Sequence, residues 1–123
     1  MIFPSPDLNA LGTHTLFELY ECDRLILNQL EKVREILLGA ARLGNATIIT
    51  HTFHQFSPQG ISGVVVIAES HLAVHTWPEH GYAAIDLFSC TDKIKTEVIE
   101  TVLRASFKSG RLEKIILHRG KNL

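Results

Sequence analysis

The residues best suited to chemistry lie between Ser62 and Cys90, in the segment SGVVVIAESHLAVHTWPEHGYAAIDLFSC. Ser70 brings a hydroxyl, His75 an imidazole and Cys90 a thiol, and an activated nucleophile needs a base within hydrogen-bond reach. The apolar runs on both sides of residues 69–70 predict two antiparallel strands, which would return His75 to the first of them. We therefore expect these groups to surround one peptide bond, the one that precedes Ser70.

Elements outside this segment must position it. Alternating and β-branched residues predict further strands before and after it, and apolar residues at helical spacing predict two helices, the first capped by Asp23 and continuous to Ala41, the second capped by Asp92. The order predicts an α+β fold, a two-layer sandwich of an antiparallel sheet with two helices packed on one face. The other face of the sheet needs a cover, and self-association is the simplest one.

Length and composition exclude several classes of function. With 123 residues, 46% of them hydrophobic and 20% charged, the chain predicts a single globular domain. A net charge of −1 provides no basic surface for nucleic acid or for a membrane, and no apolar run approaches the roughly 20 residues of a membrane span. The N-terminus lacks the basic region of a signal peptide, so we expect a cytoplasmic protein in which Cys22 and Cys90 are free thiols.

The same segment carries a family resemblance. Its motifs resemble the core of the prokaryotic S-adenosylmethionine decarboxylases: Glu-Ser-His-Leu from Glu69, His-Thr-Trp-Pro-Glu from His75, Gly-Tyr-Ala-Ala-Ile-Asp-Leu-Phe from Gly81, and Cys90. The likeness extends to residues 12–23 and 46–63 and so covers most of the chain. Members of this family make their own cofactor, a pyruvoyl group, by cutting their own chain.

The resemblance implies cleavage between Glu69 and Ser70, which leaves a β chain of residues 1–69 and an α chain of residues 70–123. In this reading the Ser70 hydroxyl attacks the Glu69 carbonyl, and elimination and hydrolysis convert Ser70 into the pyruvoyl group. That carbonyl forms a Schiff base with the substrate amine and accepts electrons as CO₂ leaves. Considered without the resemblance, Ser70 is an ordinary turn serine at a hairpin tip.

Family roles also fall on three neighbours of this bond. His75 matches a histidine that assists processing, and Ser62 matches a serine that assists it by hydrogen bonding near the scissile carbonyl. Cys90 matches the acid that returns a proton to the substrate α-carbon. The alternatives are a strand histidine bonded to backbone, a turn serine entering a strand, and a small buried cysteine.

Three further residues match a nucleoside-binding role. The resemblance places the adenine ring between Phe56 and Trp77, and the ribose hydroxyls on Glu79. Aromatic side chains more often belong to a protein core, and Glu79 could simply be solvated.

Metal chemistry is not predicted, although the chain contains seven histidines. His51 and His54 would face opposite sides of a strand, and His71 and His75 share a face only if the hairpin tip does not intervene between them. Cys-x-x-Cys and His-Glu-x-x-His patterns do not occur in the sequence. We expect no metal site.

The resulting hypothesis is a self-processing pyruvoyl-dependent enzyme that converts S-adenosylmethionine to its decarboxylated form, the aminopropyl donor for spermidine, and that pairs as a homodimer. One alternative keeps this scaffold but decarboxylates ornithine or arginine, since the processing motif builds the cofactor and does not read the substrate. Thr91 also stands where the family commonly has glycine, which leaves substrate contacts open. A second alternative is an uncleaved regulatory homologue without activity.

Overall fold

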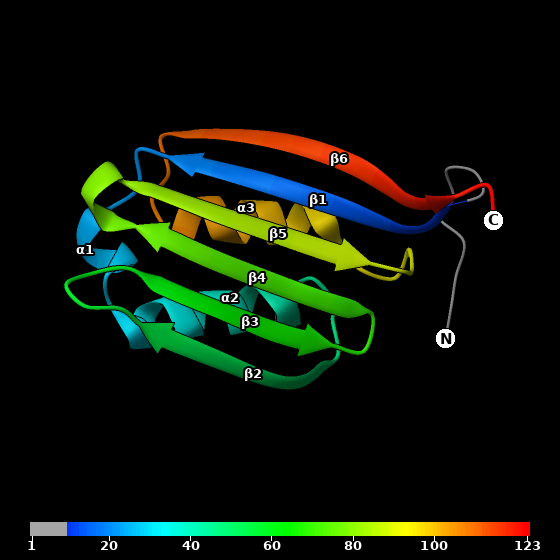
Figure 1. Cartoon of the computed structure of the whole chain (residues 1–123), viewed down its shortest axis with the longest axis horizontal. Helices are drawn as coiled ribbons and strands as arrows, with labels where there is room; N and C mark the ends of the chain where they lie inside the picture. Colours follow the sequence, from blue (N-terminus) through cyan, green and yellow to red (C-terminus); the bar gives the residue numbers. More distant parts are fainter. Residues whose placement is uncertain (1–9) are drawn as a thin grey trace.

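Six strands form one antiparallel sheet in the computed structural model, which describes residues 10–123. The strands lie in the order β2-β3-β4-β5-β1-β6, so the last strand occupies one edge and β2 the other (Figure 1). Their bounds are Ala10–Tyr20 (β1), Ile48–Gln55 (β2), Ile61–Ile67 (β3), Ser70–Trp77 (β4), Tyr82–Ser89 (β5) and Arg111–Lys121 (β6). Consecutive strands β2 to β5 are neighbours, which makes the central chemical segment one continuous meander.

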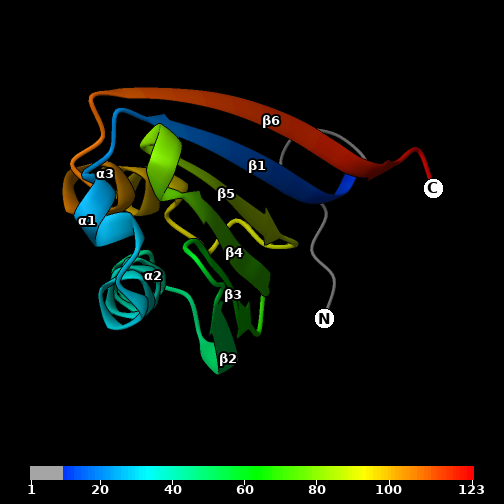
Figure 2. The ribbon, with the colours of Figure 1, turned by 60° about the vertical axis from the view of Figure 1, so that its left-hand side comes forward.

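The helices cover one face of this sheet. Helix α2 (Leu30–Leu43) and helix α3 (Thr96–Ser106) lie on the same side as the short helix α1 (Arg24–Leu27), as Figure 2 shows. A single 3₁₀ turn, η1 (Pro78–His80), joins β4 to β5. The α+β two-layer sandwich predicted from the sequence is therefore confirmed. Within residues 10–123, none of the helices has both the length and the apolar character needed to cross a membrane.

Strict alternation along β4 and β5 decides which side chains reach the helices. Leu72 and Val74 on β4, and Ile85 and Leu87 on β5, are buried and belong to the core under the helices. Their sequence neighbours point to the opposite, open face, because successive side chains of a strand alternate. The strand register places four exposed apolar side chains on this face: Val66, Trp77, Ile115 and Leu117.

The first helix is interrupted, in contrast to the continuous helix predicted from the sequence. Asp23 does cap α1, since its carboxylate accepts from the backbone N–H groups of Leu25 and Ile26. The helical ladder then stops because the Thr76 hydroxyl donates to the Leu27 carbonyl at 2.8 Å, replacing the next intrahelical bond. A contact from β4 thus overrides the local helical pattern.

The predicted start of the second helix was also wrong. Helix α3 begins at Thr96 after Lys95, and Asp92 lies in the preceding loop rather than at the cap. The buried side chains of α3 are Ile99 and Leu103. The shift lengthens the loop that follows Cys90, and this loop reaches the candidate site.

Candidate active site

The hairpin between β3 and β4 places the Glu69–Ser70 bond at one end of the sheet. Ile67 pairs with Ser70, so only Ala68 and Glu69 form the turn. Ser70 has a φ of 151°, a backbone conformation that side-chain-bearing residues rarely adopt. Such strain costs on the order of 1–3 kcal/mol and persists only where the surrounding structure enforces it. The bond that the sequence singled out is therefore a strained one.

Cys90 holds the carbonyl of this bond. Its backbone N–H donates to the Glu69 carbonyl oxygen at 3.1 Å, and its thiol donates to the same oxygen, with an Sγ–O distance of 3.2 Å. The contact follows from sheet register, since Ser89 pairs with Ser70 and the chain leaving β5 passes the turn. Two donors on one carbonyl oxygen polarise it and stabilise the negative charge that develops when a nucleophile attacks.

The Glu69 side chain is buried although it belongs to a hairpin turn. It is only 1% exposed. Its Oε1 accepts from the Thr47 backbone N–H at 3.1 Å, and its Oε2 accepts from Lys93 Nζ at 3.0 Å. Burial by itself raises the pKa of Glu69, but the hydrogen bonds from Thr47 and Lys93 outweigh it and lower the pKa below its ordinary value. The side chain is thus an ionised, anchored carboxylate at neutral pH.

His75 returns to β3, as predicted, and pairs there with Ser62. The Ser62 Oγ to His75 Nδ1 distance is 2.8 Å. The expectation that His75 also lies beside the Glu69–Ser70 bond of its own chain was wrong. His75 is five positions along β4 from Ser70, which is roughly 16 Å for an extended strand, and an odd separation puts the two side chains on opposite faces.

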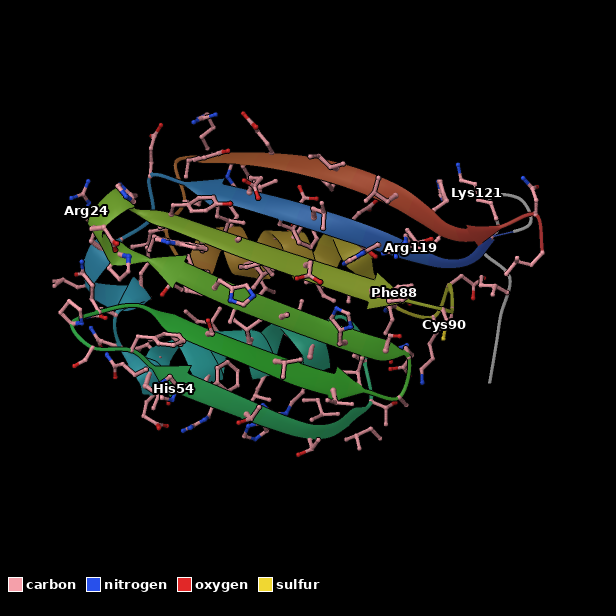
Figure 3. All side chains as sticks on the ribbon, viewed as in Figure 1. Arg24, His54, Phe88, Cys90, Arg119 and Lys121 are labelled. Carbon is pink, nitrogen blue, oxygen red and sulfur yellow. The ribbon has the colours of Figure 1, made fainter. Side chains whose placement is uncertain are left out.

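Figure 3 makes the separation visible. His54, which pairs in register with Ser62, lies toward one end of the sheet, and Cys90 lies at the other end. The described part of the chain therefore holds two groups of candidate residues. The cleavage group is Glu69, Ser70 and Cys90, and the imidazole group is Ser62 and His75.

The three residues predicted to bind a nucleoside are brought together beside the imidazole group. A cavity of about 310 Å³ is lined by Phe56, Trp77 and Glu79 together with Ser62 and His75. Trp77 packs on Tyr82 with ring centroids 5.4 Å apart, which supports one wall. A space lined by aromatic side chains and a carboxylate suits a planar heterocycle that carries hydroxyl groups.

Among residues 10–123, one cluster has the spacing of a metal site, and the sequence did not indicate it. The ligand atoms of His14, His71 and Asp86 lie within 4.8 Å of one another on the open face. Both Nε2 atoms contact Asp86 Oδ2 at 2.8 Å, and Arg119 Nη1 lies 3.1 Å from His14 Nδ1. Since Arg119 can only donate, His14 carries its proton on Nε2 and donates it to Asp86. The cluster is satisfied as a hydrogen-bond network, and the nearby guanidinium opposes a cation.

The two thiols differ in their surroundings. Cys22 is 7% exposed, and burial raises its pKa to about 11. Cys90 is half-buried at the cleavage group. Since the thiolate is the reactive form, iodoacetamide at pH 8 is expected to alkylate Cys90 at least about tenfold faster than Cys22. Mass spectrometry of peptides sampled over time measures the alkylation rates of both cysteines. Equal rates would contradict the conclusion that Cys22 is buried and Cys90 is accessible.

Lys93 and Thr47 are the functional candidates that sequence reasoning missed. Lys93 is 24 residues from its partner Glu69, and Thr47 is 22 residues away. No local pattern links them to the turn, and a lysine in a polar loop reads as a solvated charge. The sequence offers one indication of them, which is Glu69 itself. If a turn glutamate is buried, its carboxylate requires hydrogen-bond partners from elsewhere in the chain.

Comparisons with known proteins identify the family of the chain. The profile of a family described as S-adenosylmethionine decarboxylase matches residues 13–120. The S-adenosylmethionine decarboxylase proenzyme of Thermodesulfovibrio yellowstonii is 56% identical over 111 residues, which cover 90% of this chain and 82% of the relative. The proenzyme of the same name from Thermotoga maritima is 45% identical over 114 residues, which cover 93% of this chain and 88% of the relative.

Solved structures give the same result. The adenosylmethionine decarboxylase of Aquifex aeolicus superposes with a TM-score of 0.84 at 38% identity, covering 91% of this chain and 92% of that one. A Trypanosoma brucei enzyme, AdoMetDC-delta26, superposes with a TM-score of 0.60 at 14% identity, over 85% of this chain and 45% of that one. At this identity the second likeness concerns the fold alone.

Proposed function

Because the chain belongs to the S-adenosylmethionine decarboxylase family, we propose that it is made as a proenzyme, cuts itself between Glu69 and Ser70, and decarboxylates S-adenosylmethionine. The product is the aminopropyl donor for spermidine. The observation that carries the proposal is the Glu69 carbonyl, held by both the N–H and the thiol of Cys90 next to a strained Ser70.

The cleavage uses only this chain and water. The Ser70 Oγ bonds to the Glu69 carbonyl carbon, and the C–N bond breaks, so the amide becomes an ester and a free amine. Removal of the Ser70 α-proton then breaks the Cβ–O bond, which releases the Glu69 carboxylate and leaves dehydroalanine. Its imine tautomer takes up water and releases ammonia, and residue 70 ends as a pyruvoyl group. The two Cys90 donors stabilise the oxyanion of the first step.

The pyruvoyl group supplies an electrophilic carbonyl that binds the substrate amine and accepts electrons as CO₂ departs. The donor set fits its formation, since the carbonyl oxygen that must carry charge has two donors within 3.2 Å. In the proposal, Cys90 then protonates the substrate α-carbon. Phe56 and Trp77 enclose the adenine, and Glu79 accepts from the ribose hydroxyls.

We expect two copies to form one functional unit. The imidazole group and the nucleoside cavity lie roughly 16 Å from Ser70 along one strand, too far to act on the same substrate atom or the same bond. A second copy that covers the open face, with its exposed Val66, Trp77, Ile115 and Leu117, would bring its own Ser62 and His75 toward the end of the sheet that holds Ser70. Each active site would then combine the cleavage group of one protomer with the imidazole group of its partner.

Decarboxylation of ornithine or arginine on the same scaffold is less well supported. A small basic amino acid has no planar ring to fill a cavity walled by Phe56 and Trp77.

The proposal is tested by intact mass and by substrate. Freshly purified wild-type protein is expected to give two fragments, 1–69 and 70–123, the second without an N-terminal amine and reactive toward hydrazine. Carboxyl-labelled S-adenosylmethionine should release CO₂, while labelled ornithine and arginine should not. A single full-length mass without a trappable carbonyl would favour the uncleaved regulatory homologue, and CO₂ from a basic amino acid would refute the substrate assignment.

A further inference from the structure

We propose that Lys93 is a positioning residue for self-cleavage, which acts by clamping the Glu69 side chain and thereby holding the scissile carbonyl on Cys90. This inference rests on the proposed function and adds a residue to it. The clamp consists of Glu69, Lys93 and Thr47, and we use the name for these three residues.

Each carboxylate oxygen of Glu69 has its own donor in the clamp. Oε1 is 3.1 Å from the Thr47 backbone nitrogen, and Oε2 is 3.0 Å from Lys93 Nζ. Lys93 Nζ also lies 3.3 Å from the Thr47 hydroxyl oxygen, so the ammonium contacts both partners. The turn itself is tied to the same segment, because the Ala68 N–H donates to the Thr47 carbonyl at 2.8 Å.

Lys93 is delivered to the clamp by an ordered loop. Its backbone N–H donates to the Thr91 hydroxyl at 3.1 Å, and its carbonyl accepts from the Asn45 side chain at 3.3 Å. The lysine side chain is 47% exposed, whereas that of Glu69 is 1% exposed. Lys93 therefore covers the buried carboxylate from the solvent side, where a methionine could take its place without opening the core.

The clamp bears directly on the bond that breaks. The acyl half of this bond is held at two points, at the carbonyl by Cys90 and at the side chain by the clamp. Without Lys93 the Glu69 carboxylate would be a buried charge without its counter-ion and without the donor on Oε2, which is unfavourable, so it would turn toward water. Since side chain and carbonyl belong to one residue of a two-residue turn, this motion would draw the carbonyl away from Cys90 and out of reach of Ser70.

The test is a time course of cleavage after a radioactive leucine pulse in cell-free translation, with full-length chain and fragments separated under denaturing conditions. Lys93→Met is expected to lower the rate constant of cleavage about 10- to 100-fold, the usual effect of misplacing a reacting group. Lys93→Arg keeps the cation and is expected to cleave within about threefold of wild type.

Lys114→Met is the matched control. Lys114 Nζ contacts Glu100 Oε1 at 2.8 Å, a lysine–glutamate pair of similar length on α3 and β6 away from the turn. This variant is expected to cleave at the wild-type rate. Melting temperatures of Ser70→Ala and of Ser70→Ala/Lys93→Met are compared as uncleaved proteins, and both are expected to lie above the temperature of the cleavage assay.

A double-mutant cycle separates the clamp from general destabilisation. Glu69→Gln leaves an amide oxygen for Thr47 but no charge for Lys93, so Lys93→Met/Glu69→Gln is expected to cleave no more slowly than the slower single variant. The inference is overturned if the two single substitutions lower the rate constant of cleavage independently, so that their effects multiply in the double variant. It is also overturned if Lys93→Met cleaves at the wild-type rate, or if Lys93→Arg cleaves as slowly as Lys93→Met. If wild type itself fails to cleave, the proposed function fails first, and the two results are distinguishable.

Discussion

Ser70→Ala protein is expected to remain one full-length chain indefinitely and to release no CO₂ from S-adenosylmethionine. Alanine has no hydroxyl to attack the Glu69 carbonyl, and neither Ala68 nor Glu69 of the turn carries a hydroxyl. The change removes one atom from a half-buried side chain, so the fold and the Cys90 contacts to the Glu69 carbonyl are expected to persist. Intact mass over several days, together with circular dichroism, measures both outcomes.

Ser106→Ala is a suitable control, since Ser106 ends α3 on the helical layer and has no part in the turn. It is expected to yield the same two fragments as wild type. Fragments 1–69 and 70–123 from the Ser70→Ala protein would mean that another group attacks the bond, and the assignment of the cleavage group would then be wrong.

Two inactive variants are expected to restore one another when they share a dimer. We expect each site to combine Ser70 of one protomer with His75 of its partner. In a heterodimer of one Ser70→Ala protomer and one His75→Ala protomer, one site then lacks both residues and the other site keeps both. Purified through two different tags, this heterodimer is expected to have about half the activity of the wild-type dimer, because one of two equivalent sites is intact. Each homodimeric variant is expected to be inactive.

The matched control pairs Ser70→Ala with Cys90→Ala. The Glu69 carbonyl contact places Cys90 in the same cleavage group as Ser70, so no site of this heterodimer has both residues and activity is expected to stay absent. Absence of activity in the Ser70→Ala/His75→Ala heterodimer would show that His75 serves its own protomer. An active His75→Ala homodimer would show that the imidazole group has no role at the active site.

Local sequence determined much of the fold and half of the site. Apolar and β-branched runs specified the strands of the central meander. The sequence predicted a hairpin tip over residues 68–71, but β4 already begins at Ser70, so the turn is shorter than predicted. The pairing of His75 with Ser62 is a direct consequence of that register. The family motifs pointed to Ser70 and Cys90, and sheet neighbours then bring Cys90 onto the Glu69 carbonyl.

Other features depended on contacts between distant segments. The break between α1 and α2 is made by the Thr76 hydroxyl from β4, and the shared carboxylate of His14 and His71 comes from Asp86 on a third strand. None of these contacts produces a recognisable pattern in a short stretch of the sequence, since each partner alone is an ordinary polar residue of its own helix or strand.

What the sequence determined by itself was the set of strands around the Glu69–Ser70 bond, because strands follow from neighbours a few positions apart. The choice of this bond for cleavage rests on the family resemblance and stays a prediction. Only the tertiary structure decided that Glu69 is buried on Lys93 and Thr47, and that His75 faces away from Ser70 at the far end of the same strand. The physical reason is that an extended strand separates residues by about 3.3 Å per position, while folding alone brings together side chains that are more than twenty positions apart.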